Sequence, residues 1–104
     1  MKFKEKLLEQ LHKHASSNPY NRLVYEMFIS LFKDLEGSPE HMIDAIQYIF
    51  STYFYDNSEN PLSLEKICLE LDLNIKNLRQ AFLQYLYELS NVKPVLFNFI
   101  TNSL

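Results

Sequence analysis

Apolar side chains recur every three or four residues along most of the chain, and this spacing places them on one face of an α-helix. The pattern is interrupted at Asn18-Pro19 and at Ser38-Pro39, which are residue pairs typical of helix starts. We therefore expect an all-α protein of five or six helices. The predicted ranges are 2–15, 19–36, 39–55, 64–71 and 75–90, with a short last helix over 95–101.

The composition excludes several other folds. The 104 residues include one glycine and four prolines, too few for the many turns of a β-sandwich or barrel. A glycine-rich phosphate-binding loop is excluded for the same reason. Gly37 follows the second predicted helix, and we expect it to end that helix in the left-handed conformation.

The reactive side chains form no pattern typical of an enzyme or a metal site. Cys68, the one cysteine, cannot form an intramolecular disulfide, and no activating base lies near it in sequence. His12 and His14 point to different faces of a helix, and His41 has no partner ligand in sequence. Because the carboxylates are also scattered, we predict no catalytic residue, no metal and no cofactor.

The chain carries no recognisable membrane or export signal. Its longest apolar runs are too short to cross a bilayer, and its first ten residues, MKFKEKLLEQ, lack the apolar core of a signal peptide. A single cysteine is typical of a reducing compartment. We expect a cytoplasmic protein that has no membrane partner.

Residues 63–83 have the spacing of a helix-turn-helix, in which two helices cross closely at a tight turn. Cys68 is the small residue expected at the crossing, and Asp72 can adopt the positive φ that the turn needs at modest cost. Ser63 and Asn74 are placed to cap the two helices. The apolar residues expected to hold this unit to the core are Leu64, Ile67, Leu71, Leu73 and Leu78.

The second helix of such a unit can lie in the DNA major groove with its first residues toward the base edges. Asn and Gln side chains pair with adenine there, and Arg pairs with guanine. Ser63 and Lys66, near the start of the first helix, are candidates for phosphate contacts. The complete set of candidate DNA-binding residues is Ser63, Lys66, Asn74, Lys76, Asn77, Arg79, Gln80 and Gln84.

The stretch NPLSLEKICLELDLNIKNLRQAFLQYL resembles the first helix-turn-helix of the AraC-type transcription regulators, and the likeness extends over roughly residues 40–100. Cys68, Asp72 and Asn74 stand where the family usually has Ala, Gly and Ser, and Gln80 stands where it usually has Arg. The resemblance implies a helix-turn-helix DNA-binding protein, with residues 61–100 corresponding to one subdomain. Because the family normally carries two such motifs, a single motif implies either dimerisation or a different role. The residues that match the family pattern are Pro61, Leu62, Ser63, Leu64, Glu65, Ile67, Leu71, Leu73, Leu78 and Phe82.

We predict one helical domain over residues 1–104, with a helical hairpin over 1–37 and a helix-turn-helix subdomain over 38–104. The chain has seven tyrosines and eight phenylalanines, and an aromatic surplus on a small protein often marks an interface. We therefore expect a homodimer formed through the hairpin. The tyrosines that a core does not obviously need are Tyr25, Tyr48, Tyr55 and Tyr87.

The charge distribution restricts where nucleic acid can bind. The formal net charge is −3, with −5 over residues 41–72 and +2 over residues 73–104. A protein that coats nucleic acid without sequence preference is usually basic throughout, so DNA contact must be local and must lie in the last third. We predict a small, dimeric DNA-binding transcription regulator. The alternatives are a regulator that docks on another transcription factor or on RNA polymerase without binding DNA, and a helical bundle in which the motif has no function.

Overall fold

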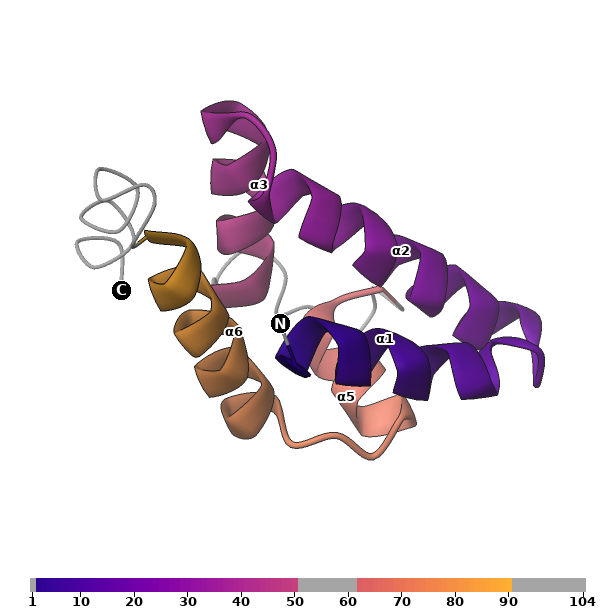
Figure 1. Cartoon of the computed structure of the whole chain (residues 1–104). Coiled ribbons are helices and arrows are strands. Elements are labelled where there is room, and N and C mark those ends of the chain that lie inside the picture. Colours follow the sequence, from indigo (N-terminus) through magenta and orange to yellow (C-terminus); the bar gives the residue numbers. More distant parts are fainter. Residues whose placement is uncertain (1, 51–61, 91–104) are drawn as a thin grey trace.

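The computed structural model describes residues 2–50 and 62–90, and these form five helices and no strand. The prediction of an all-α protein is confirmed. The end of the predicted third helix and the predicted last helix lie outside the described residues. The helices, shown in Figure 1, are α1 (Lys2–Ala15), α2 (Pro19–Leu35), α3 (Pro39–Phe50), α5 (Leu64–Glu70) and α6 (Ile75–Ser90).

The first two helices form an antiparallel hairpin because a compact cap joins them (Figure 1). The Asn18 side chain accepts a hydrogen bond from the backbone N–H of Asn21 at 2.8 Å. Pro19 occupies the first turn of α2, where a missing N–H leaves nothing unsatisfied. Both features were predicted from the sequence, and both are confirmed.

The expectation for Gly37 is wrong. No glycine in the described residues has a positive φ. α2 instead ends at Glu36, a right-handed cap residue, and Gly37 donates its N–H to the carbonyl oxygen of Asp34 at 3.1 Å. A Cβ at position 37 would lie 3.1 Å from the carbonyl oxygen of Lys33. Glycine is therefore favoured here by a close backbone approach, and not by conformational freedom.

An aromatic cluster joins the hairpin to the last described helix. Phe82 of α6 is fully buried and stacks on Phe32 and Phe28 of α2, with ring centroids 5.4 and 6.4 Å apart. Phe3 of α1 meets Phe82 edge-on at 5.0 Å, and Tyr85 meets Phe32 in the same manner at 5.3 Å. Such pairs stabilise a core beyond the area they bury. Because buried residues of all five helices form one cluster, residues 1–37 share their core with the rest of the chain.

An ion pair between Lys4 and Glu36 lies at one edge of this aromatic cluster. The Lys4 ammonium lies 3.0 Å from the Glu36 carboxylate and 5.8 Å from the centre of the Phe32 ring. Partial burial raises the pKa of Glu36, but the hydrogen bond from Lys4, the nearby Tyr85 hydroxyl and the Lys4 charge outweigh it and leave the pKa below its usual value. The pair therefore ties the start of α1 to the end of α2.

Two of the four surplus tyrosines, Tyr25 and Tyr48, form contacts within the fold. Tyr25 is half-buried and packs its ring edge-on against His12 at 5.2 Å. Tyr48 donates its hydroxyl proton to the carbonyl oxygen of Leu62 at 2.6 Å, which fixes the chain just before α5 against α3. Tyr87 is exposed, and Tyr55 lies outside the described residues.

Candidate nucleic-acid interface

The start of α5 is fixed by Ser63. Its hydroxyl accepts a hydrogen bond from the backbone N–H of Lys66 at 3.2 Å, as the sequence predicted for a cap. The same residue is fully buried, so its side chain presents no surface to a phosphate. Lys66 is half-buried, and its ammonium lies 3.1 Å from the Glu70 carboxylate one helical turn later. Of the two expected phosphate contacts, Lys66 alone reaches the surface, and its charge is largely offset.

The turn after α5 is a Schellman motif, a common way to end a helix. The N–H of Leu73 donates to the carbonyl oxygen of Cys68 at 2.8 Å, and the N–H of Asp72 donates to that of Leu69 at 3.4 Å. Asp72 has φ 55° and is the one described non-glycine residue with a positive φ, which confirms the predicted conformation. Leu73 is half-buried and packs against the core. The turn therefore fixes the direction in which α6 leaves.

α6 begins with a second predicted cap. The Asn74 side-chain oxygen accepts a hydrogen bond from the backbone N–H of Asn77 at 3.0 Å. Leu78 and Phe82 face inward and are buried, which turns the opposite flank of the helix to solvent. This exposed flank, called the amide flank below, is formed by Lys76, Asn77, Gln80 and Gln84.

Arg79 does not belong to the amide flank. It is half-buried, and its Nε donates to the carbonyl oxygen of Ile49, near the end of α3, at 2.9 Å. Burial raises the pKa of the neighbouring Cys68 thiol, and the Arg79 charge only partly opposes this effect, so the thiol is protonated at neutral pH. The Nε donor of Arg79, a predicted guanine-contacting residue, is therefore used in a contact between helices.

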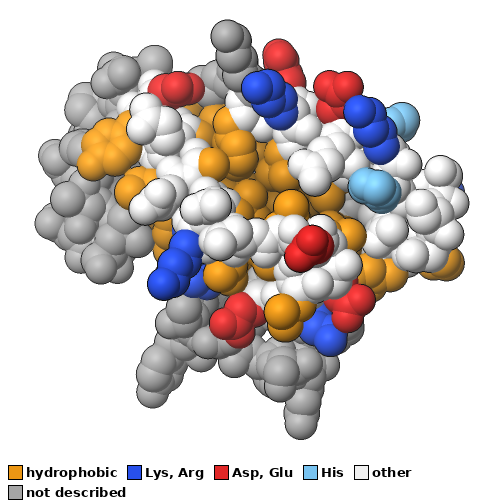
Figure 2. Space-filling model, turned by 90° about the horizontal axis from the view of Figure 1, so that it is seen from below, with side chains coloured by type: hydrophobic (Ala, Val, Ile, Leu, Met, Phe, Trp, Pro, Cys, Tyr) orange, Lys and Arg blue, Asp and Glu red, His pale blue; other side chains and the backbone are white. Residues whose placement is uncertain are grey.

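Two polar residues of α1 that no sequence pattern singled out lie beside the amide flank. Lys6 and Gln10 line a cavity of about 330 Å³ together with Asn74 and Asn77. The other residues that line it are Asp72 and the apolar Phe3, Leu7, Leu73 and Leu78. Figure 2 shows this face, with apolar side chains along its middle and charged and polar ones around them. The sequence signal was weak: Lys6 and Gln10 are one turn apart on α1, but nothing local indicates which helix they adjoin.

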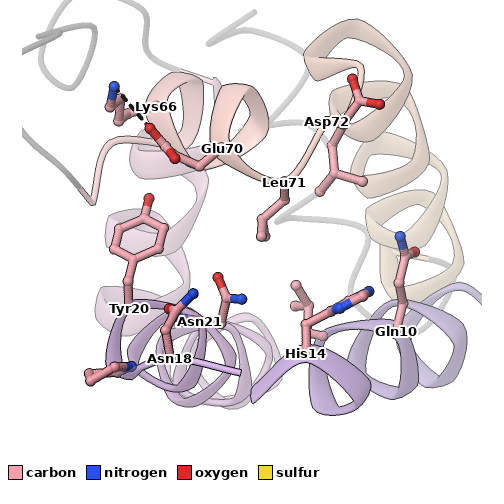
Figure 3. Close-up of a pocket in the computed structure, with 12 residues that line it drawn as sticks. Gln10, His14, Asn18, Tyr20, Asn21, Lys66, Glu70, Leu71 and Asp72 are labelled. Carbon is pink, nitrogen blue, oxygen red and sulfur yellow. Dashed lines mark hydrogen bonds and ion pairs between the residues drawn. The ribbon is translucent and has the colours of Figure 1, made fainter. Parts of the chain in front are cut away.

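A larger cavity of about 700 Å³ adjoins the first and shares Gln10, Asp72 and Leu73 with it. Figure 3 shows it between the α1–α2 turn and the end of α5, with Tyr20 on one side and the Lys66–Glu70 pair on another. Burial raises the pKa of Tyr20, and the negative charge of Glu70, together with that of Cys68 once its thiol is deprotonated, raises it further. The Tyr20 hydroxyl is therefore protonated at neutral pH.

Within residues 2–50 and 62–90, no three His, Cys, Asp or Glu side chains lie close enough together to hold a metal ion. None of the helices in those ranges is both long enough and apolar enough to span a membrane.

Comparison with known proteins adds no constraint on the site. No protein-family model, no curated protein sequence and no solved structure matches the chain significantly. The functional interpretation therefore depends on the residues and geometry of the chain itself.

Proposed function

We propose that this protein is a small helix-turn-helix DNA-binding transcription regulator whose amide flank enters the major groove. The observation that carries the proposal is the solvent exposure of Lys76, Asn77 and Gln80 on the first turns of α6, soon after the turn at Asp72. Side chains at the start of the second helix are the ones that reach base edges in this mode of binding. A DNA-binding role also accords with the proposed cytoplasmic location.

Phosphate attraction in this proposal comes from Lys6 and Lys76. Both are exposed, and neither forms an ion pair with an acid of the described residues. Lys6 shares a cavity with Asn77, so α1 adds a positive charge beside the amide flank. Two cations per protomer give weak binding, because each neutralised phosphate contributes separately to affinity. A dimer doubles these contacts.

The proposed dimer uses the hairpin, as the sequence suggested. Leu23 of α2 is 48% exposed, and Met27 follows one turn later on the same side of the helix. An apolar pair of this kind suits a contact between two copies of the chain. Analytical ultracentrifugation of the wild type and of Leu23→Glu tests it: we expect a dimer and a monomer, respectively. A monomeric wild type at high micromolar concentration would refute the dimer.

Selection from random double-stranded DNA, followed by a binding assay in low salt, tests the proposed function. We expect the wild type to enrich a specific sequence. The double variant Lys76→Ala, Asn77→Ala is expected to lose that binding while keeping its helical circular dichroism. Gln47→Ala removes an exposed amide from α3 and is the matched control, expected to bind like the wild type. Failure of the folded wild type to bind any DNA at micromolar concentration would refute the proposal.

A second candidate function, docking on another regulator or on RNA polymerase, is favoured by the outer face of α5. Leu69 there is 76% exposed and stands between the acidic residues Glu65 and Glu70. An exposed apolar side chain with acidic neighbours suits a basic protein surface better than DNA. Leu69→Glu should abolish a protein complex and leave DNA binding nearly unchanged. A complex with polymerase that survives high salt would favour this second function.

A further inference from the structure

The exposed side chains of the proposed DNA-binding face are mostly carboxamides. Asn77, Gln80 and Gln84 are exposed carboxamides, and Lys76 is the exposed cation among them. The guanidinium of Arg79, which is the side chain best suited to guanine, is held against the carbonyl oxygen of Ile49. From this composition we infer that the amide flank selects adenine–thymine base pairs and discriminates against guanine.

The chemistry of the base edges supports this assignment. A carboxamide carries one acceptor and one donor group, and adenine presents a matching donor (N6) and acceptor (N7) in the major groove. Guanine presents two acceptors there and is bound best by a guanidinium. Asn77 and Gln80 are separated by roughly 4.5 Å along the helix axis, which is comparable with the spacing of neighbouring base pairs.

The other polar side chains near the amide flank are not expected to select a base pair. Asn74 is also an amide, but its oxygen is used to cap α6, so it is not expected to contact a base. Lys76 and Lys6 supply charge beside the flank and discriminate little between sequences, since phosphate contacts position the protein without specifying a base. Asp72 lines the same cavity as Asn77 and repels phosphates that approach from the turn. Specificity is thereby assigned to three uncharged residues.

This inference rests on the proposed function, and one selection experiment separates the two. Wild-type protein is used to select from random double-stranded DNA, and the bound pool is sequenced. We expect enrichment of A·T pairs at the contacted positions, with a preference of at least about fivefold at each, the low end for a two-point contact. A pool enriched in guanine at those positions would overturn the inference while leaving DNA binding intact. A folded protein that binds no DNA would overturn both.

Three variants test which side chain selects the base. Gln80→Arg introduces a guanidinium on the amide flank, and we expect one contacted position to change its preference from adenine to guanine. Gln47→Ala, which removes an amide from α3, is expected to leave the selected sequence unchanged. Arg79→Lys keeps a positive donor near Ile49 and is also expected to leave it unchanged. If Arg79→Lys abolished the sequence preference of a protein that melts normally, Arg79 would be the specifying residue and the inference would be wrong.

Discussion

The guanidinium of Arg79 is bonded to the carbonyl oxygen of Ile49, 2.9 Å from Nε, and this contact connects the middle of α6 to the end of α3. A hydrogen bond from a charged donor is stronger than one between neutral groups. Arg79 is therefore a structural residue that orients α6.

The first prediction follows from this contact. Arg79→Ala should lower the free energy of unfolding by about 1–2 kcal/mol, because it removes a charge-assisted hydrogen bond that is partly shielded from water. Arg22 is the matched control: it is largely exposed and pairs with Glu26 in the next turn, so Arg22→Ala should cost about 0.3–0.5 kcal/mol. Urea denaturation measures both. Equal effects of the two substitutions would show that the contact with Ile49 adds nothing.

The second prediction concerns the turn between α5 and α6. Asp72 has φ 55°, a conformation that costs a β-branched residue roughly 1–2 kcal/mol. Asp72→Val should therefore lower the free energy of unfolding by about that amount, whereas Asp72→Asn should be close to neutral, since asparagine tolerates this conformation. Thermal denaturation compares the variants. A Val variant as stable as the wild type would mean that the turn adopts another conformation in solution.

Local chemistry explains which parts of the site could be predicted from the sequence. The roles of Ser63, Asp72 and Asn74 depend on neighbours within five residues, so capping and turn rules identify them, and the structure confirms all three roles. The partner of Arg79 is thirty positions away, and the approach of Lys6 to Asn77 depends on how α1 packs. No local pattern encodes either contact. The burial of Ser63 was missed for the same reason.

The third prediction concerns Tyr85. Its side chain is buried, and its hydroxyl lies near the Glu36 carboxylate but forms no hydrogen bond of full geometry with a described residue. Burial, together with the nearby negative charge of Glu36, holds its pKa above the usual value. Because an unsatisfied buried hydroxyl costs free energy, Tyr85→Phe should leave stability unchanged or raise it by about 1 kcal/mol. A marked loss of stability on urea denaturation would reveal that the hydroxyl has a partner in solution.

The fourth prediction is a dependence of stability on pH. The pKa of Glu36 is lowered in the folded protein, so its contribution is fully present above the unfolded value of 4.5 and is lost as the pH falls below it. The effect should stay under about 1 kcal/mol, because both Lys4 and Glu36 are partly exposed. We expect wild type and Glu36→Gln to differ in melting temperature at pH 7 and to converge near pH 3. A difference that persists at pH 3 would exclude the ion pair as its cause.

The fifth prediction concerns the salt dependence of DNA binding under the proposed function. The logarithm of the affinity falls with the logarithm of salt concentration by roughly 0.9 per neutralised phosphate. Lys6→Gln and Lys76→Gln should each reduce this slope by about 0.9 per protomer. Lys13→Gln is the control, because Lys13 lies at the far end of α1 and pairs with Glu9. Titrations at several salt concentrations measure the slopes, and an unchanged slope for Lys6→Gln would remove α1 from the interface.

The contact between Phe3 and Phe82 has a consequence for folding during synthesis on the ribosome. The two rings meet edge-on at 5.0 Å, yet they belong to the first turn of α1 and the middle of α6. Closing a chain of that length has an entropic cost that must be met before the contact can contribute. During synthesis the ribosome releases the N-terminal helix long before its aromatic partner emerges. Phe3 therefore leaves the exit tunnel well before the ring against which it packs in the folded protein.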